Sequence, residues 1–274
     1  MKKNVILPAL ALAGGVAGFF LRRWQLASAY QPETGLFVRG APATIALLGL
    51  TSLLALVFLF LLREKTEGTE DFLPAFGCPS PGQMAVLATA FAVFLVAGGF
   101  SMQMGFQGLR LWQAMPQQYQ LSIPASQLLA GGLAVIAGFA VLHMGRMAYW
   151  GELNSAACFL SSFPALAGLV WMFSTHLQNG SEPVLMKYGF ELFAALLLTL
   201  AHYYIAGFLF GKPHVRRTAF LSLMGIVLGV TSLADGVELF AAAFSLSALG
   251  FVYALLAAPW PERMPPAEEE ERDN

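Results

Sequence analysis

The feature that most constrains this chain is a series of long apolar stretches that contain almost no charged residues. An α-helix needs about 20 apolar residues to cross roughly 30 Å of hydrocarbon, so each stretch predicts a membrane-spanning helix. We expect eight of them, at residues 5–21, 43–62, 84–102, 126–143, 156–173, 185–210, 218–233 and 239–259. Barrel strands alternate in hydropathy over about ten residues, so these unbroken runs disfavour a β-barrel.

The composition agrees with this apolar pattern. Hydrophobic residues make up 57% of the chain and charged residues 11%, against roughly 45–50% and 25% in soluble domains. Eight of the 31 charged residues, 15 basic and 16 acidic, lie within 262–274, so the rest cannot cover a soluble surface. The sequence predicts an all-α fold over residues 1–261, a polytopic transmembrane helical bundle with about eight spans and short loops. Residues 262–274 are expected to form a disordered acidic cytoplasmic tail that aids solubility or binds a protein partner.

The charge, the cysteine positions and the loop lengths argue against several function classes. The net charge is −1 and no dense basic patch occurs, so nucleic-acid binding is not expected. Cys78 and Cys158 lie far apart without neighbouring ligand residues, which excludes a CxxC metal or redox site. The loops are at most about 23 residues long and carry no catalytic motif. We therefore predict no metal and no cofactor, and an enzyme is less favoured than a binding or transport protein.

Orientation follows from the distribution of lysine and arginine, because cytoplasmic loops carry the excess of these residues. With eight spans, ten basic residues fall on the side of the termini and five on the other side. This bias predicts a bacterial inner-membrane protein with both termini in the cytoplasm. The five residues on the outer side are Arg22, Arg23, Arg39, Arg110 and Lys187.

The first apolar stretch leaves two alternatives open, because Arg22 and Arg23 follow it directly on the expected outer side. We favour a spanning helix. The stretch is only about 17 residues long and rich in glycine, so a re-entrant segment is one alternative. A cleaved signal peptide is the other, since Lys2 and Lys3 precede the stretch and small residues follow at 27–29.

Charged residues near the outer ends of the spans form the main candidate site, because ionisable groups at membrane depth are costly and commonly functional. Three cations face three anions there, and the six residues are Arg22, Arg23, Arg110, Glu191, Asp235 and Glu238. The functional interpretation is a vestibule for a charged or zwitterionic ligand, or a gate held by ion pairs. The alternative is ordinary interfacial charge, with arginines reaching to headgroups and carboxylates hydrated at helix ends.

Two histidines in the inner half of the spans, His143 and His202, form a second candidate set. His202 shares a helix face with Glu191, because eleven residues at 100° each complete about three turns. Imidazoles on two helices can ligate a haem iron or relay a proton to a quinone. The alternative is that each histidine hydrogen-bonds to a neighbouring helix.

Two resemblances add to this interpretation. The run from Arg22 to Thr44, with the segments 187–192 and 203–208, resembles bacterial polytopic membrane proteins of unassigned function, and the likeness covers most of the chain. The segment Leu142-His143-Met144-Gly145 is similar to a His-x-Gly segment in the eight-helix membrane anchors of DMSO-reductase-type enzymes, which exchange electrons with quinone. This second likeness implies a ligand or relay role for His143, although the predicted position of the N-terminus differs from that of those anchors.

Two function classes follow. In the first, the protein transports or binds a small molecule within the helical bundle. In the second, it is a non-catalytic or electron-transferring membrane subunit whose helices pack against partners in a larger complex.

Overall fold

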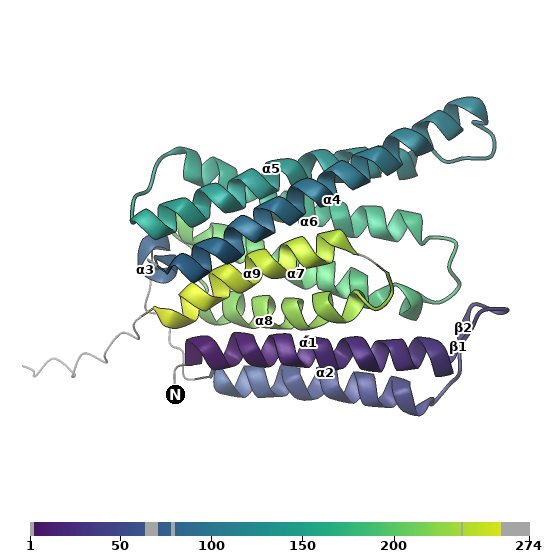
Figure 1. Ribbon diagram of the computed structural model, residues 1–274, viewed down its shortest axis with the longest axis horizontal. Coiled ribbons are helices and arrows are strands. Elements are labelled where there is room, and N and C mark those ends of the chain that lie inside the picture. Colours follow the sequence, from purple (N-terminus) through teal and green to yellow (C-terminus); the bar gives the residue numbers. More distant parts are fainter. Residues whose placement is uncertain (1–2, 64–70, 78–79, 237, 259–274) are drawn as a thin grey trace, which may run out of the picture.

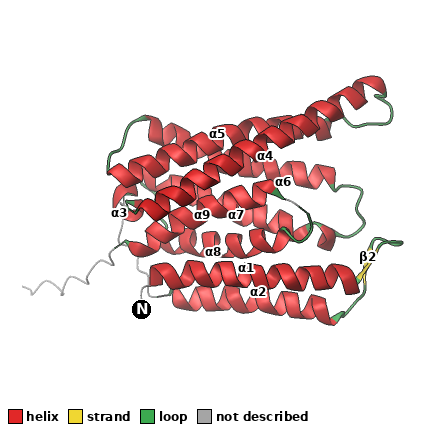
Figure 2. Cartoon of the chain, viewed as in Figure 1, coloured by secondary structure: helices red, strands yellow, loops and turns green. Residues whose placement is uncertain are grey.

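The computed structural model describes residues 3–63, 71–77, 80–236 and 238–258, and these form a bundle of long helices (Figures 1 and 2). The helices are α1 (Lys3–Ser28), α2 (Pro42–Leu61), α3 (Phe72–Phe76), α4 (Pro81–Ala114), α5 (Ser122–Trp150), α6 (Ala156–Gln178), α7 (Gly189–Gly207), α8 (Val215–Ser232) and α9 (Leu239–Ala257). Short elements between them are β1 (Tyr30–Gln31), β2 (Leu36–Phe37) and the 3-10 turns η1 (Leu185–Lys187) and η2 (Phe208–Phe210). Cys78 and the predicted tail 262–274 lie outside the described residues.

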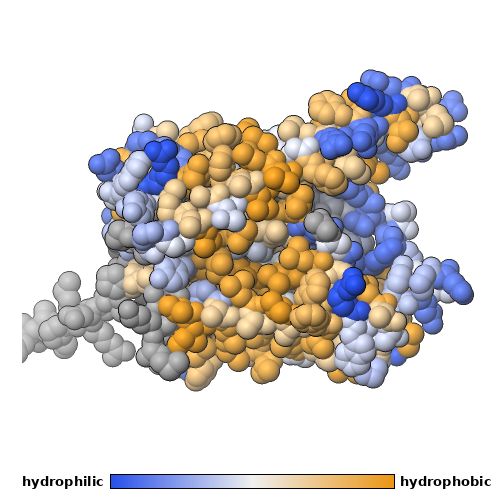
Figure 3. All heavy atoms as spheres, viewed as in Figure 1, coloured by the Kyte–Doolittle hydropathy of each residue, from blue (hydrophilic) through white to orange (hydrophobic). Residues whose placement is uncertain are grey.

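Eight of the described helices are long and apolar enough to cross a membrane, which confirms the predicted all-α helical bundle. Apolar side chains cover the middle of the visible face of the molecule, and polar residues gather at its two ends (Figure 3). The chain is therefore a multi-pass membrane protein whose apolar belt fits a lipid bilayer.

Several helix boundaries follow from proline and glycine chemistry. Pro42 and Pro81 stand in the first turns of α2 and α4, where a missing backbone N–H costs nothing. Gly151 and Gly211 end α5 and η2 with φ of 73° and 65°, a left-handed conformation that glycine adopts without strain. These signals place most of the connections where the sequence predicts them.

Other boundaries differ from the prediction because helices continue past their apolar stretches. α1 runs unbroken to Ser28, a length of about 39 Å, so Arg22 and Arg23 lie inside the helix and not in a loop. α4 has 34 residues and a length of about 51 Å, and its last turns project with the start of α5 beyond the other helices (Figure 1). The segment after α1 also contains the β1–β2 hairpin, with Tyr30 paired to Phe37, which the apolar pattern did not predict.

The contacts between helices place α8 and α9 at the centre of the bundle. α9 packs against α4, α8, α1 and α7, while α8 packs against α7, α1 and α9. α5 and α6 complete the other side, and α2 lies at the edge against α1. α4 and α5 approach closely at Gly98 and Gly131, where a Cβ on either residue would meet the carbonyl oxygen of the other at 2.7 Å.

Candidate functional site

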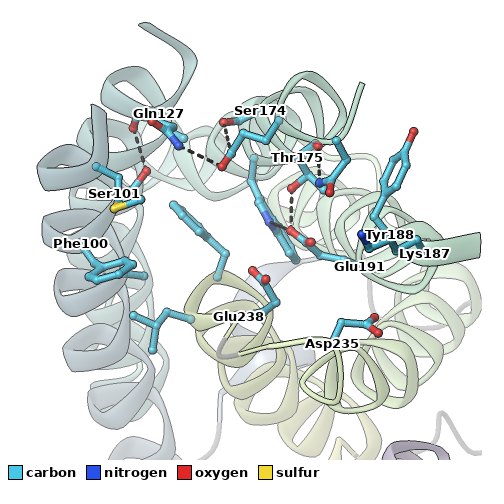
Figure 4. A pocket seen from close by; sticks show the side chains of 18 of the residues that line it. Phe100, Ser101, Gln127, Ser174, Thr175, Lys187, Tyr188, Glu191, Asp235 and Glu238 are labelled. Carbon is cyan, nitrogen blue, oxygen red and sulfur yellow. Dashed lines mark hydrogen bonds between the residues drawn. The ribbon is translucent and has the colours of Figure 1, made fainter. Parts of the chain in front are cut away.

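A cavity of about 510 Å³ lies among α4, α5, α6, α7 and α9, near the end of the bundle that carries the α6–α7 and α8–α9 connections. We call this end the cavity end. Three carboxylate residues line the cavity together, and they are Glu191, Asp235 and Glu238 (Figure 4). We therefore call it the acidic cavity.

Arg22 is completely buried behind the acidic cavity and holds one of these carboxylates. Its Nε donates to Asp235 Oδ1 at 2.7 Å, and its Nη2 donates to the backbone oxygens of Met186 and Lys187 at 3.0 and 2.8 Å. The guanidinium also lies over the Phe190 ring, 5.0 Å from its centroid. A charge-assisted pair with further hydrogen bonds is the arrangement that a buried arginine requires.

Gln25, one turn after Arg22 on α1, extends this arrangement to α2. Its Oε1 accepts from Arg22 Nη1 at 2.6 Å, and its Nε2 donates to Thr44 Oγ1 at 2.8 Å. Four segments are thereby joined at the cavity end: α1, α2, η1 and the α8–α9 connection. We call Arg22, Gln25, Thr44 and Asp235 the arginine network.

Glu191 stands in the first turn of α7 and faces the acidic cavity, with 8% of its surface exposed. Its Oε1 accepts hydrogen bonds from Trp171 Nε1 at 3.0 Å and from Thr175 Oγ1 at 2.6 Å. The N-terminal end of a helix also favours a negative charge. Within the described residues, no basic side chain pairs with this carboxylate.

Glu238 immediately precedes α9 and brings a second carboxylate without a described cationic partner into the cavity. Burial raises the pKa of Glu238 to about 7, and the negative charges of Glu191 and Asp235 add to the increase. Burial also raises the pKa of Asp235, and the Arg22 guanidinium opposes that increase. The carboxyl of Glu238 thus gains or loses a proton near neutral pH.

Uncharged polar side chains line the opposite wall of the cavity (Figure 4). Gln127 Nε2 donates to Gln178 Oε1 at 2.9 Å, and Gln178 Nε2 donates to Ser174 Oγ at 3.0 Å. Ser101 Oγ donates to the backbone oxygen of Gln127 at 2.8 Å. This wall offers hydroxyl and amide groups from α4, α5 and α6 without adding charge.

Aromatic rings lie in the wall of the acidic cavity and pack against one another next to it. The Trp171 ring stacks on Phe240 and Phe244, with centroids 5.9 and 5.3 Å apart. Phe244 also meets Phe94 edge to face at 4.9 Å. Three helices, α6, α9 and α4, contribute to this aromatic layer, and Phe100 and Tyr188 add further rings to the cavity wall.

The structure brings together four of the six charged residues that the sequence groups by depth. Glu191, Asp235 and Glu238 line the cavity, and Arg22 lies directly behind it. Arg23 and Arg110 are exposed and do not line the cavity. Gln25, Lys187 and the polar face of α6 were not among the predicted site residues. That face has a visible signal, because Trp171, Thr175 and Gln178 follow helical spacing.

The two candidate histidines lie apart. His202 is buried, and its ring nitrogens contact the backbone oxygen of Leu198 at 2.8 Å and Ser247 Oγ at 2.9 Å. His143 contacts the Asn154 side chain in a separate cavity of about 280 Å³. Among the described residues, no three His, Cys, Asp or Glu side chains gather closely enough to hold a metal ion.

Comparison with protein-family models, curated proteins and solved structures finds no match for this chain. The likeness of the His143 segment to DMSO-reductase-type anchors therefore stays a prediction. The case for function depends on the geometry of the acidic cavity.

Proposed function

We propose that this membrane protein binds a small molecule in the acidic cavity, and that binding is the first step of transport across the membrane. The observation that carries the proposal is the cavity itself, about 510 Å³ in volume with charged, uncharged polar and aromatic walls. Sites for small ligands typically occupy about 300–1,000 Å³ and lie between helices of a bundle. A few convergent polar groups among apolar side chains are also typical of such sites.

The position of the cavity at one end of the bundle supports a transport role. The cavity lies at one end of the bundle, and Trp171 in its wall stacks on Phe244, which in turn packs against Phe94. A transporter exposes its site to one side at a time and moves helices or bundles to reach the other. The present arrangement corresponds to access from the cavity end.

The second function class, a non-catalytic or electron-transferring subunit, gains no comparable observation. His143 and His202 have different partners and do not line a common cavity. That hypothesis stays a prediction.

A cavity-filling variant tests the proposal. Protein purified in dodecyl maltoside is heated with a panel of amines, amino acids, carboxylic acids and sugars. Ser101→Trp places an indole in the cavity, and Val96→Trp on the outward face of α4 is the matched control. We expect at least one compound to raise the melting temperature of the wild type and of Val96→Trp, but not of Ser101→Trp. That compound should also enter vesicles containing the wild type and not those containing Ser101→Trp.

Two results would contradict the proposal. One is a panel in which no compound shifts the melting temperature of the wild type. The other is a shift that persists unchanged in Ser101→Trp, because the ligand would then bind elsewhere.

A further inference from the structure

The acidic cavity has an imbalance of charge that points to the class of its ligand. Asp235 is compensated by Arg22, and Lys187 on the cavity wall is paired with Glu182. Glu191 and Glu238 have no cationic partner among the described residues, although Glu191 is more than nine-tenths buried and faces the cavity. A buried carboxylate without a counter-ion is costly, so a ligand that supplies a positive charge removes this cost.

The aromatic rings are a second and independent observation. Trp171 donates to Glu191 and stacks on Phe240, and Phe100 and Tyr188 also line the cavity. Aromatic faces attract organic cations and accommodate their apolar parts at the same time. Carboxylates combined with aromatic rings fit an ammonium group that carries a hydrocarbon substituent.

Other cations and anions fit the cavity less well. A divalent metal ion requires several closely spaced oxygen or nitrogen ligands, and the described side chains form no such group. An anion would meet two uncompensated carboxylates, while the nearby cations Arg22 and Lys187 are already paired. The uncharged wall of Ser101, Gln127 and Ser174 is suited to hydrogen bonds from a further polar group on the ligand.

We infer that the ligand of the acidic cavity is a protonated amine with an apolar substituent, held between Glu191 and Glu238 and against the aromatic rings of Trp171 and Phe240. This assignment rests on the proposed small-molecule function and specifies its substrate class. The ammonium group comes from a free amine or from an ammonium-bearing lipid headgroup, which present the same chemistry to the two carboxylates.

Benzylammonium is the probe that tests this inference, with benzyl alcohol and benzoate as neutral and anionic probes of similar shape. Binding is measured by calorimetry and by the shift in melting temperature, in dodecyl maltoside at pH 8. We expect benzylammonium to bind the wild type and the other two probes to produce no shift at equal concentration. Glu191→Gln and Glu238→Gln should each weaken binding at least tenfold. Glu152→Gln, which changes a carboxylate outside the acidic cavity, should leave it unchanged.

The source of the ammonium group is distinguished by adding phosphatidylethanolamine to the same sample. Competition with benzylammonium identifies a lipid headgroup as a ligand, whereas binding that is insensitive to the lipid identifies a free amine. Either result supports the assignment to an ammonium group. Both glutamate substitutions remove buried charge, so we expect the variants to stay folded. A melting transition of each variant without ligand checks this.

Two results would overturn the inference. The first is equal affinity of the wild type and of the double variant Glu191→Gln/Glu238→Gln for benzylammonium. The second is binding of benzoate or benzyl alcohol in preference to benzylammonium. If that binding is lost in Ser101→Trp, the proposed cavity function stands and only the ligand class is wrong. If it persists in Ser101→Trp, the proposed function fails as well.

Discussion

Two groups of buried charge lie side by side at the cavity end, and they are satisfied in opposite ways. Arg22 uses its guanidinium on Asp235, Gln25 and two backbone oxygens, so its charge and its donors have partners inside the protein. Glu191 has two neutral donors and Glu238 has no described cationic partner. The first group therefore leaves no charge unpaired and is destabilised when one partner is removed, whereas the second lowers stability as long as it is ionised.

The contrast separates a structural charge from a functional one without reference to related proteins. A buried ion pair that is fully hydrogen-bonded fixes the positions of the segments it joins. Carboxylates that face a cavity without a counter-ion are stabilised when a ligand supplies the missing charge. Substitutions in the two groups should consequently change stability in opposite directions.

The largest expected effect is that of Arg22→Met. The substitution leaves Asp235 without a counter-ion and removes the donors to Gln25 and to two backbone oxygens. Breaking a fully buried pair from one side costs about 3–5 kcal/mol, and because the Asp235 side chain is 15% exposed we expect a value at the low end of that range. We expect a corresponding loss of stability in denaturant or thermal unfolding in detergent.

Arg23→Met is the matched control for this prediction, because Arg23 is the adjacent residue and is exposed. Its effect on stability should stay within about 0.5 kcal/mol. Equal effects of the two substitutions would show that the arginine network does not hold the cavity end together.

The next largest effect is a partial recovery when the partner charge is also removed. Arg22→Met/Asp235→Asn should be about 1–2 kcal/mol more stable than Arg22→Met, because the carboxylate no longer lacks a partner. Asp235→Asn alone should destabilise the wild type, since it leaves the Arg22 charge unpaired. The four proteins form a double-mutant cycle, and strictly additive changes would contradict a direct coupling between Arg22 and Asp235.

The apolar stretches were sufficient to predict the eight long helices, but not where the helices end. Apolar residues report contact with lipid, whereas a helix continues as long as its backbone hydrogen bonds and its neighbours support it. α4 thus continues through Gln103, Gln107 and Arg110, and α1 continues through Arg22. The β1–β2 hairpin is too short to produce a pattern of its own.

The sequence predicted at which depth in the membrane the charged site residues lie, but not which side of its helix each one occupies. Arg22 and Arg23 have nearly the same depth in the sequence, yet consecutive residues differ by 100° around a helix, so one is buried and the other exposed. The pairing of Arg22 with Asp235 joins positions 213 residues apart, and a single sequence has no signal for it. The neutral wall of Gln127, Ser174 and Gln178 was not predicted, because only ionisable residues are costly enough at membrane depth to mark a site by themselves.

A smaller effect, of opposite sign to that of Arg22→Met, is expected from Glu238→Gln. A carboxyl whose pKa is raised from 4.5 to about 7 destabilises the folded protein once the unfolded chain ionises, because the folded state then holds a proton that the unfolded state releases. The cost is absent below about pH 4.5, grows as the pH rises to 7 and is complete above that value. Glu238→Gln should therefore raise stability on the order of 1–3 kcal/mol at pH 8 and leave it unchanged at pH 4.5.

This profile is measured by thermal unfolding of both proteins between pH 4.5 and 8.5. The other groups that face Glu238 are Glu191 on α7 and Asp235 in the α8–α9 connection, with Arg22 paired to the latter, and both proteins retain all three. The difference between the two profiles thus reports the removal of the Glu238 charge, including its repulsion of Glu191 and Asp235. A stabilisation that is equal at all pH values would exclude removal of charge as its cause.

The smallest effect is expected from Lys187→Met, which tests whether any charge pair at the cavity end stabilises the fold. Lys187 pairs with Glu182, but their side chains are 36% and 25% exposed, unlike the fully buried Arg22. Hydrogen bonding to Glu182 is the main reason that the pKa of Lys187 is raised, so the ammonium stays charged throughout the accessible pH range. Exposed pairs contribute about 0–1 kcal/mol, and we expect a loss within that range that shrinks as salt is added. A loss of stability comparable to that of Arg22→Met would mean that burial does not distinguish the two pairs. It would contradict the prediction that the arginine network contributes more to stability than an exposed pair.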